Sequence, residues 1–434
     1  MFGRRGWKLP TTLLAVGALL VLWPGWQGYL WMRGPVLDVA WQAVPDRPAT
    51  VRAVGAWAVG EDAETVVRAR GDALIAYDSR AGDRRWVLRA PVRKSVCGMS
   101  DTVVDGIGLV AFSRHDKPCD TVWGVGVRDG RKVWERELDG VSAFSSASDG
   151  LLAADGDTAV ALADDAVRGF GLADGTPRWT TRLTEPKSVE PADDEVECRP
   201  KVGSAAGGTT RVVVQCDTFL DFRSAWLVTL DNATGKETAR QRLPVESPVV
   251  GAMVVAAEPF TLLLTEEDDR GVAAVLSFAG DGDPVRIPLT ADQEDLVIDT
   301  AAYPKGFLAR PALTAVVRDE VLVVAATEPG GDSPERIVAH SLRDGRRMWH
   351  ADLGIPVVAL APDGDGELAV LGANQRLWTI GVADGAWRGE SDGTTIREAG
   401  GLIETCAQLL RAGDTWVAVN PNGVHHPPLL AFRP

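Results

Sequence analysis

A short pattern recurs along this chain and limits its fold more than any other feature. Each copy is a run of alternating apolar residues, a turn that ends in Gly, and a Trp four positions after that Gly. Four close copies occupy residues 73–86, 121–134, 166–179 and 336–349. Because a repeated unit buries its apolar face against its neighbours, the pattern predicts a repeat architecture.

Three weaker copies fill the gaps between the close ones, at residues 225–239, 275–286 and 377–387. Ala239 stands at the Trp position of the first, the second has no Trp there, and Trp387 comes two positions early in the third. Successive turn glycines are 40 to 63 residues apart. This spacing leaves room for four short strands in each unit.

The residues within each copy indicate a β-hairpin. Period-two alternation is typical of a half-buried strand, and Asp-Gly or Thr-Gly supplies a turn residue with positive φ. A lone hairpin is not stable in water, and no helical periodicity lies between the copies. The repetition therefore predicts an all-β fold, a β-propeller of four-stranded blades.

The two ends of the repeat region are expected to close the ring together. The last segment offers three strands, at residues 405–410, 415–420 and 428–432, and lacks a fourth. Residues 36–43 form an orphan strand with Trp41 at the repeat position. This strand is predicted to complete the final blade, which removes an exposed sheet edge. The count gives eight blades, or seven if the unit around Gly282 is not a blade.

The repeat tryptophans are the candidate structural residues. At the second strand of each hairpin, a large flat side chain is expected to pack between adjacent blades rather than to stack on a ligand. These residues are Trp41, Trp86, Trp134, Trp179, Trp349 and Trp387.

The N-terminal residues predict that the protein is located at a membrane. Residues 1–8 carry Arg4, Arg5 and Lys8 without an acid, and residues 9–31 have no charged side chain. About 20 apolar residues span a bilayer as a helix, and basic residues on its N-terminal side stay in the cytoplasm. We expect residues 9–31 to be an uncleaved transmembrane signal anchor that leaves the propeller, residues 36–434, outside the cytoplasm. The alternative is a cleaved signal peptide, although no small-residue cleavage site follows.

The cysteines agree with an oxidising compartment. Cys97 and Cys119 lie within one repeat unit, and Cys198 and Cys216 lie within another. We expect both pairs to form disulfides, the alternative being buried free thiols. Cys406 is left over.

Charge and motifs argue against several functions. The chain has a formal net charge of −15, which disfavours nucleic acid because phosphate binding depends on Lys and Arg. No His-Glu-x-x-His motif occurs. The acids of residues 363–367 lack the spacing of a calcium loop and are expected to form a turn. We predict no catalytic residue, no metal site and no cofactor.

The unit at residues 73–86, Ala-Leu-x-Ala-x-Asp-x-x-x-Gly-x-x-x-Trp, resembles the repeat of quinoprotein propellers, which bind pyrroloquinoline quinone. The resemblance covers nearly all of residues 36–434. It implies the propeller fold but does not choose a function, since the repeat occurs both in quinoprotein alcohol dehydrogenases and in the scaffold lipoprotein of the outer-membrane assembly machinery. The chain lacks the adjacent cysteines of those enzymes and the lipid-bearing cysteine of that scaffold. A preference for Arg over Lys indicates a bacterial genome rich in GC.

The sequence therefore predicts a non-enzymatic, membrane-anchored and monomeric propeller that serves as a protein-interaction or sensing scaffold of the bacterial cell envelope. Its partner would be an envelope protein, with the long loops at residues 184–201 and 327–336 as candidate contacts. The alternatives are a redox or small-molecule-binding protein that uses the propeller funnel for a quinone or a sugar, and a purely structural envelope component.

Overall fold

The computed structural model describes residues 36–433, except 48–54, 61–63, 115–118, 139–151, 164–165, 187–194, 219–220, 268–272, 280–281, 292–293, 299–313, 390–392, 398–407, 421–422 and 425. Every regular element in these residues is a β-strand. None of them forms a helix with the length and apolarity needed to cross a membrane. The predicted cytoplasmic segment 1–8, the predicted anchor 9–31 and Cys406 lie outside the described residues.

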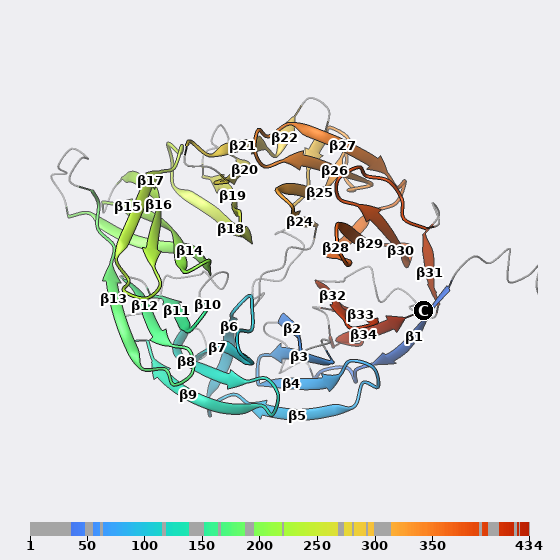
Figure 1. The fold of residues 1–434 in the computed structure, drawn as a ribbon, viewed down its shortest axis with the longest axis horizontal. Helices are drawn as coiled ribbons and strands as arrows, with labels where there is room; N and C mark the ends of the chain where they lie inside the picture. The colour runs from blue at the N-terminus through green and yellow to red at the C-terminus, as the bar shows by residue number, and fades with distance from the viewer. Residues whose placement is uncertain are drawn as a thin grey trace, which may run out of the picture.

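Five four-stranded antiparallel sheets follow one another around a ring (Figure 1). The first two are β2 (Gly55–Val59), β3 (Thr65–Arg70), β4 (Ala73–Asp78) and β5 (Arg84–Arg89), then β6 (Lys94–Met99), β7 (Ile107–Arg114), β8 (Cys119–Gly126) and β9 (Arg131–Glu137). The third is β10 (Leu152–Asp155), β11 (Thr158–Leu162), β12 (Ala166–Gly171) and β13 (Pro177–Arg182). The next two are β14 (Glu197–Ala206), β15 (Thr209–Asp217), β16 (Phe222–Asp231) and β17 (Glu237–Arg242), then β18 (Val249–Ala257), β19 (Phe260–Glu266), β20 (Ala273–Ser277) and β21 (Val285–Pro288).

Two larger sheets complete the ring. The six-stranded sheet contains β22 (Thr290–Ala291), β23 (Glu294–Leu296), β24 (Ala315–Arg318), β25 (Val321–Thr327), β26 (Arg336–Ser341) and β27 (Arg347–Asp352). The eight-stranded sheet has the order β28 (Val357–Pro362), β29 (Glu367–Gly372), β30 (Arg376–Gly381), β31 (Thr394–Arg397), β1 (Val36–Gln42), β34 (Leu429–Arg433), β33 (Thr415–Val419) and β32 (Gln408–Ala412). The degenerate unit around Gly282 thus belongs to a regular four-stranded sheet, β18–β21.

The N-terminal strand closes the ring, as the sequence predicts. β1 pairs antiparallel with β34, with Val39 opposite Phe432 and Gln42 opposite Leu430. Its other edge pairs in parallel with β31, where Leu37 lies opposite Ile396. Both edges of β1 are therefore hydrogen-bonded. The two pairings join β28–β31 and β32–β34 into one continuous sheet.

Position within a sheet explains the residue pattern of each strand. Middle strands such as β25 are buried on both faces and are almost entirely apolar, because neighbouring sheets cover both sides. Outermost strands such as β5 and β13 alternate between exposed and half-buried residues, with the repeat Trp among the half-buried ones. The repeat in the sequence is therefore the third strand, the turn and the fourth strand of a sheet.

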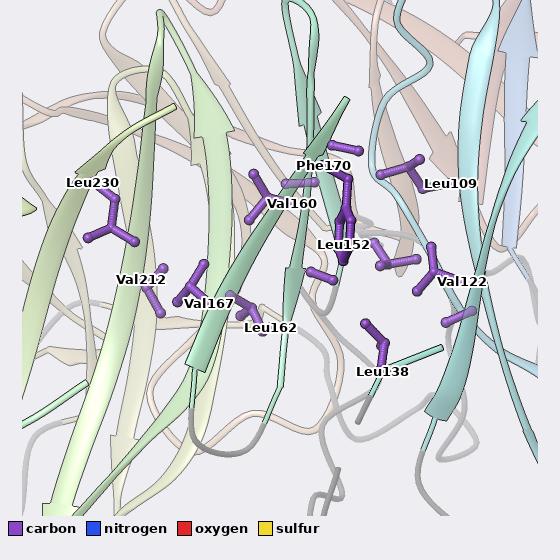
Figure 2. Packing of buried hydrophobic residues seen from close by; sticks show 14 of the residues in the cluster. Leu109, Val122, Leu138, Leu152, Val160, Leu162, Val167, Phe170, Val212 and Leu230 are labelled. Atoms are coloured by element: carbon purple, nitrogen blue, oxygen red, sulfur yellow. The ribbon is translucent and has the colours of Figure 1, made fainter. Parts of the chain in front are cut away.

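The core lies between adjacent sheets rather than at the centre of the ring. Figure 2 shows Leu109 and Val122 of the second sheet facing Leu152 and Phe170 of the third. On the other side of the third sheet, its apolar residues meet Val212 and Leu230 of the fourth. Each sheet thus stabilises both neighbours, which explains why single hairpins of this sequence need the closed ring.

Candidate functional site

Five of the six repeat tryptophans connect one sheet to the turn of the next. In each case the indole ring lies against the turn Gly of the following sheet, so closely that a Cβ on that Gly would come within 2.4–2.6 Å of ring atoms. The pairs are Trp41–Gly82, Trp86–Gly130, Trp134–Gly175, Trp179–Gly235 and Trp349–Gly385. Each of these glycines has a φ between +66° and +74°, so the same residue provides both the turn conformation and the space for the ring.

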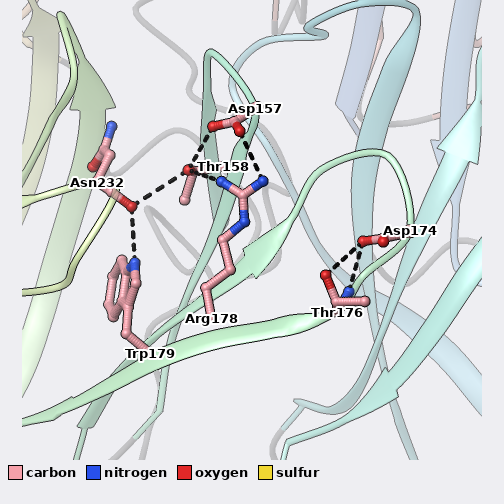
Figure 3. A network of polar contacts seen from close by, with 7 residues as sticks. All are labelled: Asp157, Thr158, Asp174, Thr176, Arg178, Trp179 and Asn232. Atoms are coloured by element: carbon pink, nitrogen blue, oxygen red, sulfur yellow. Dashed lines mark hydrogen bonds and ion pairs between the residues drawn. The ribbon is translucent and has the colours of Figure 1, made fainter.

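The indole N–H fixes each ring in place. It donates to a main-chain carbonyl three residues before the turn Gly at 2.6–3.0 Å, the acceptors being Ser79, Val127, Leu172, Asn232 and Val382. Figure 3 shows this bond for Trp179 and Asn232. The preceding Arg178 donates to Thr158 and Asp157 of its own sheet, which holds the outer strand against the turn beside it.

The contact between ring and glycine is lost where the repeat degenerates, although the turn glycines remain. Ala239 occupies the Trp position of β17, and the next turn glycine, Gly282, has no atom near its would-be Cβ. Gly345 follows the unit without a Trp and packs instead on Val285 and the main chain of Arg286. An apolar side chain of β21 thus replaces the ring at that junction.

Trp387 takes a different position from the other five. Its main chain forms an isolated bridge with Ile380 of its own sheet, and its half-buried ring packs against a cluster of residues from β24–β30. In the described part of the chain, no turn glycine lies against it. Because it follows Gly385 by two residues rather than four, it remains at the turn and does not reach the next sheet.

Both predicted disulfides are present. Cys198 of β14 and Cys216 of β15 are directly opposite in register and their Cα atoms are 4.0 Å apart. Cys97 of β6 and Cys119 of β8 are joined across a Cα–Cα distance of 6.1 Å. The first bond links neighbouring strands, whereas the second spans from the innermost to the third strand of its sheet.

A cleft of about 1250 Å³ opens where the first two sheets meet the last one. Its walls are residues 56–60 of β2 and its turn, residues 101–103 between β6 and β7, and Gln408 and Leu410 of β32. The turns that carry Arg80 and Arg128 form its rim. This volume exceeds the roughly 300–1,000 Å³ typical of small-molecule pockets. The sequence pattern did not indicate this cleft, because its walls come from the two ends of the chain.

The charges of the cleft partly neutralise each other. Arg85 donates to the Asp78 carboxylate at 2.7 Å and to the Thr65 hydroxyl at 2.6 Å. The hydrogen bond from Arg85 holds the pKa of Asp78 below its usual value, and the Ala81 N–H adds to the effect. Glu64 and Arg128 lie on the rim and are exposed. The lining of the cleft thus carries both acidic and basic side chains.

A buried ion pair lies close to the cleft, where the ring closes. Arg68 of β3 donates to Asp46, just beyond β1, at 2.6 Å, and the two side chains are only 1% and 3% exposed. Arg70 contacts the same carboxylate at 3.2 Å. These bonds fasten the end of the closing strand to the first sheet. The sequence contains a signal for this pair, since Arg68 interrupts the apolar run of a buried strand.

The side chains of the described residues do not provide a calcium site. Ca²⁺ takes six to eight oxygen ligands. In the described ranges, no three His, Cys, Asp or Glu side chains lie together as metal ligands. Both disulfides join residues far apart in sequence rather than adjacent cysteines. The cleft residues likewise include no His and no Cys.

A family model described as the outer membrane protein assembly factor BamB matches residues 38–212 and 163–356. No curated protein matches the sequence.

Three solved structures are similar in fold. Sqt1 of Saccharomyces cerevisiae is 10% identical with a TM-score of 0.51, covering 92% of this chain and 99% of that one. Quinohemoprotein alcohol dehydrogenase of Comamonas testosteroni is 10% identical with a TM-score of 0.50, covering 92% and 77%. BamB of Moraxella catarrhalis is 11% identical with a TM-score of 0.48, covering 88% and 97%. At these identities the likeness concerns the fold alone.

Proposed function

Since this chain belongs to the family of the outer membrane protein assembly factor BamB, we propose that it is a non-enzymatic scaffold that binds a protein partner in the bacterial cell envelope. The fold and the family support an interaction role in general. The observation that carries the proposal is the cleft of about 1250 Å³, which is lined by carboxylates, guanidinium groups and the innermost strand β2.

The proposal includes a ring of eight blades. The eight-stranded sheet consists of two groups of four, β28–β31 and β32–β34 with β1, joined through the β31–β1 pairing. Counted in this way, with the two short extra strands β22 and β23 set apart, the strands support a ring of eight blades. The cleft then lies at the junction of the eighth, first and second blades.

The proposed place of the scaffold is the outer face of the cytoplasmic membrane. The apolar segment 9–31 would anchor a monomeric propeller, and the two disulfides support an oxidising compartment. Alkaline phosphatase fused to the C-terminus is expected to be active in cells. An inactive fusion, with an active cytoplasmic reporter in its place, would overturn this location.

The rim of the cleft offers a matched test of the interaction. Arg128-Asp129-Gly130 and Arg343-Asp344-Gly345 are the same turn in two different sheets, and only the first borders the cleft. We expect Arg128→Glu to reduce the recovery of the crosslinked envelope partner several-fold, because it reverses the rim charge. Arg343→Glu should leave recovery unchanged. Equal recovery with both variants would contradict a binding role for this cleft.

A further inference from the structure

The innermost strand β2 presents its main chain, not its side chains, to the cleft. Trp57 and Val59 are buried toward the second sheet, in one cluster with Val110. Ala56 lies in a cluster with Val417 of the last sheet. Because both faces of β2 are covered by neighbouring sheets, its remaining surface is the strand edge that borders the cleft.

The register shows which main-chain groups lie on that edge. The Glu64 carbonyl accepts the Ser79 N–H at 3.0 Å, so it faces β4. Main-chain groups alternate along a strand, and those of Thr65 therefore face β2, where Thr65 is paired with Val59. Val59 in turn faces β3. The N–H and carbonyl of Ala58 consequently point away from the sheet, to the open edge.

A second observation agrees with this direction. The Gln408 side chain of β32 donates to the Ala56 carbonyl at 3.3 Å. Residues 56 and 58 point to the same side because the period of a strand is two. A side-chain amide thus occupies one position of the edge, in place of a neighbouring strand. The next position, Ala58, carries only a methyl group and leaves space for another chain.

From this geometry we infer that β2 binds an extended segment of a partner protein by strand addition, with main-chain hydrogen bonds to Ala58. This inference rests on the proposed interaction role and names the chemistry of recognition. Strand addition takes its affinity from the main chain and its specificity from flanking side chains. Here Glu64 and Arg128 on the rim are placed to select charged residues of the segment. The cleft volume of about 1250 Å³ suits several residues of an extended chain.

Proline substitution tests the inference directly. Ala58→Pro removes the outward N–H, and an edge strand tolerates Pro when that N–H does not belong to the ladder. The control is Val250→Pro on the innermost strand β18, at an exposed bulge outside the cleft. Both full-length variants are first compared with the parent by thermal melting, so that a folding defect is recognised.

The probe is a phage-displayed library of random twelve-residue peptides, selected on the full-length protein. We expect the enriched peptides to bind Ala58→Pro at least about tenfold more weakly and to bind Val250→Pro as they bind the parent. Every second amide of a peptide can be N-methylated in two ways, starting from the first or from the second residue. One of these two methylated peptides should lose binding. Peptides that bind Ala58→Pro equally well, or a library that gives no enrichment on the parent over Ala58→Pro, would overturn strand addition.

The same variants separate this inference from the proposed function. If the envelope partner is recovered equally with Ala58→Pro and with the parent, strand addition at β2 is wrong and the scaffold role stands. If no partner is recovered with the parent itself, the scaffold role fails independently of β2.

Discussion

At the scale of single residues, the junctions between sheets depend on a tryptophan and a glycine that are distant in sequence. The sequence repeats indicated that the Trp packs between sheets and that the Gly supplies the positive φ of the turn. They did not indicate that the two residues touch. Because the Gly belongs to the next copy of the repeat, the contact appears only once the order of sheets around the ring is known.

A glycine substitution measures this contact. In Gly175→Ala, the new Cβ would come within 2.6 Å of the Trp134 ring, while φ remains +66°. Gly156 has a φ of +54° and open space around it, so Gly156→Ala carries the backbone strain alone. We expect Gly175→Ala to lower the unfolding free energy by about 1–3 kcal/mol more than Gly156→Ala does. Equal losses in denaturant titrations would show that the ring does not constrain the turn.

The turn aspartates make stability sensitive to acid. Hydrogen bonds within the turn lower the pKa of Asp174, from the Thr176 N–H and hydroxyl, and of Asp231, from the Thr234 hydroxyl and N–H. The Ala386 N–H and Arg388 do so for Asp384. A carboxylate whose pKa is lower in the folded state stabilises the fold above its unfolded pKa, which is near 3.8.

That stabilisation is lost as the pH falls through the lower folded pKa. The melting temperature should therefore be nearly constant from about pH 7 to 5 and should drop below about pH 4. A triple variant, Asp174→Asn, Asp231→Asn and Asp384→Asn, should have a shallower decline in acid. Melting curves with the same acid slope for parent and variant would contradict this role of the turns.

At the scale of elements, the order of strands within a unit could be predicted, whereas some pairings between and beyond the units could not. Alternation and Asp-Gly turns located the third and fourth strands, and Trp41 identified β1 as the missing strand of the last unit. The parallel β1–β31 pairing and the short strands β22 and β23 were not predicted. Residues 394–397, Thr-Thr-Ile-Arg, lack the apolar period that distinguishes a strand from a loop.

The end of the closing strand is held by a buried charge, and this can be tested. Asp46→Asn leaves Arg68 buried without its counter-ion, so we expect the unfolding free energy to fall by about 3–5 kcal/mol. Asp414→Asn is the control, because Asp414 pairs with Arg80 at 3.6 Å on the exposed surface and should cost less than about 1 kcal/mol. Denaturation midpoints that are the same for both variants would show that the buried pair does not secure the closure.

At the scale of the whole molecule, the chain is a quinoprotein-like propeller of the BamB family. The repeat sufficed to predict an all-β ring because every unit carries the same strand–turn–strand pattern. The cleft could not be predicted in this way, since its walls combine the first two sheets with β32 near the C-terminus. A site formed by ring closure has no local sequence motif. A partner that is contacted through main-chain groups requires no particular side chains, so it leaves no signal in the sequence either.

The fold also makes a prediction about the quinone. Because the described residues provide no set of calcium ligands, we expect pyrroloquinoline quinone with Ca²⁺ to leave the melting temperature unchanged. A ligand at 100 times its Kd would stabilise the fold by about 2.7 kcal/mol, which a thermal-shift assay detects readily. A clear rise in the melting temperature would favour the redox alternative and require an assay of dye reduction.

In the proposed function, a partner protein binds in the cleft where the first two sheets meet the last one. The most direct test of this claim is site-specific photo-crosslinking in intact cells, with a photoreactive amino acid at Arg128 and, as the matched control, at Arg343. We predict a discrete adduct with one envelope protein from position 128 and none from position 343. Adducts from position 343 alone, the same adducts from both positions, or none from position 128 would contradict the claim.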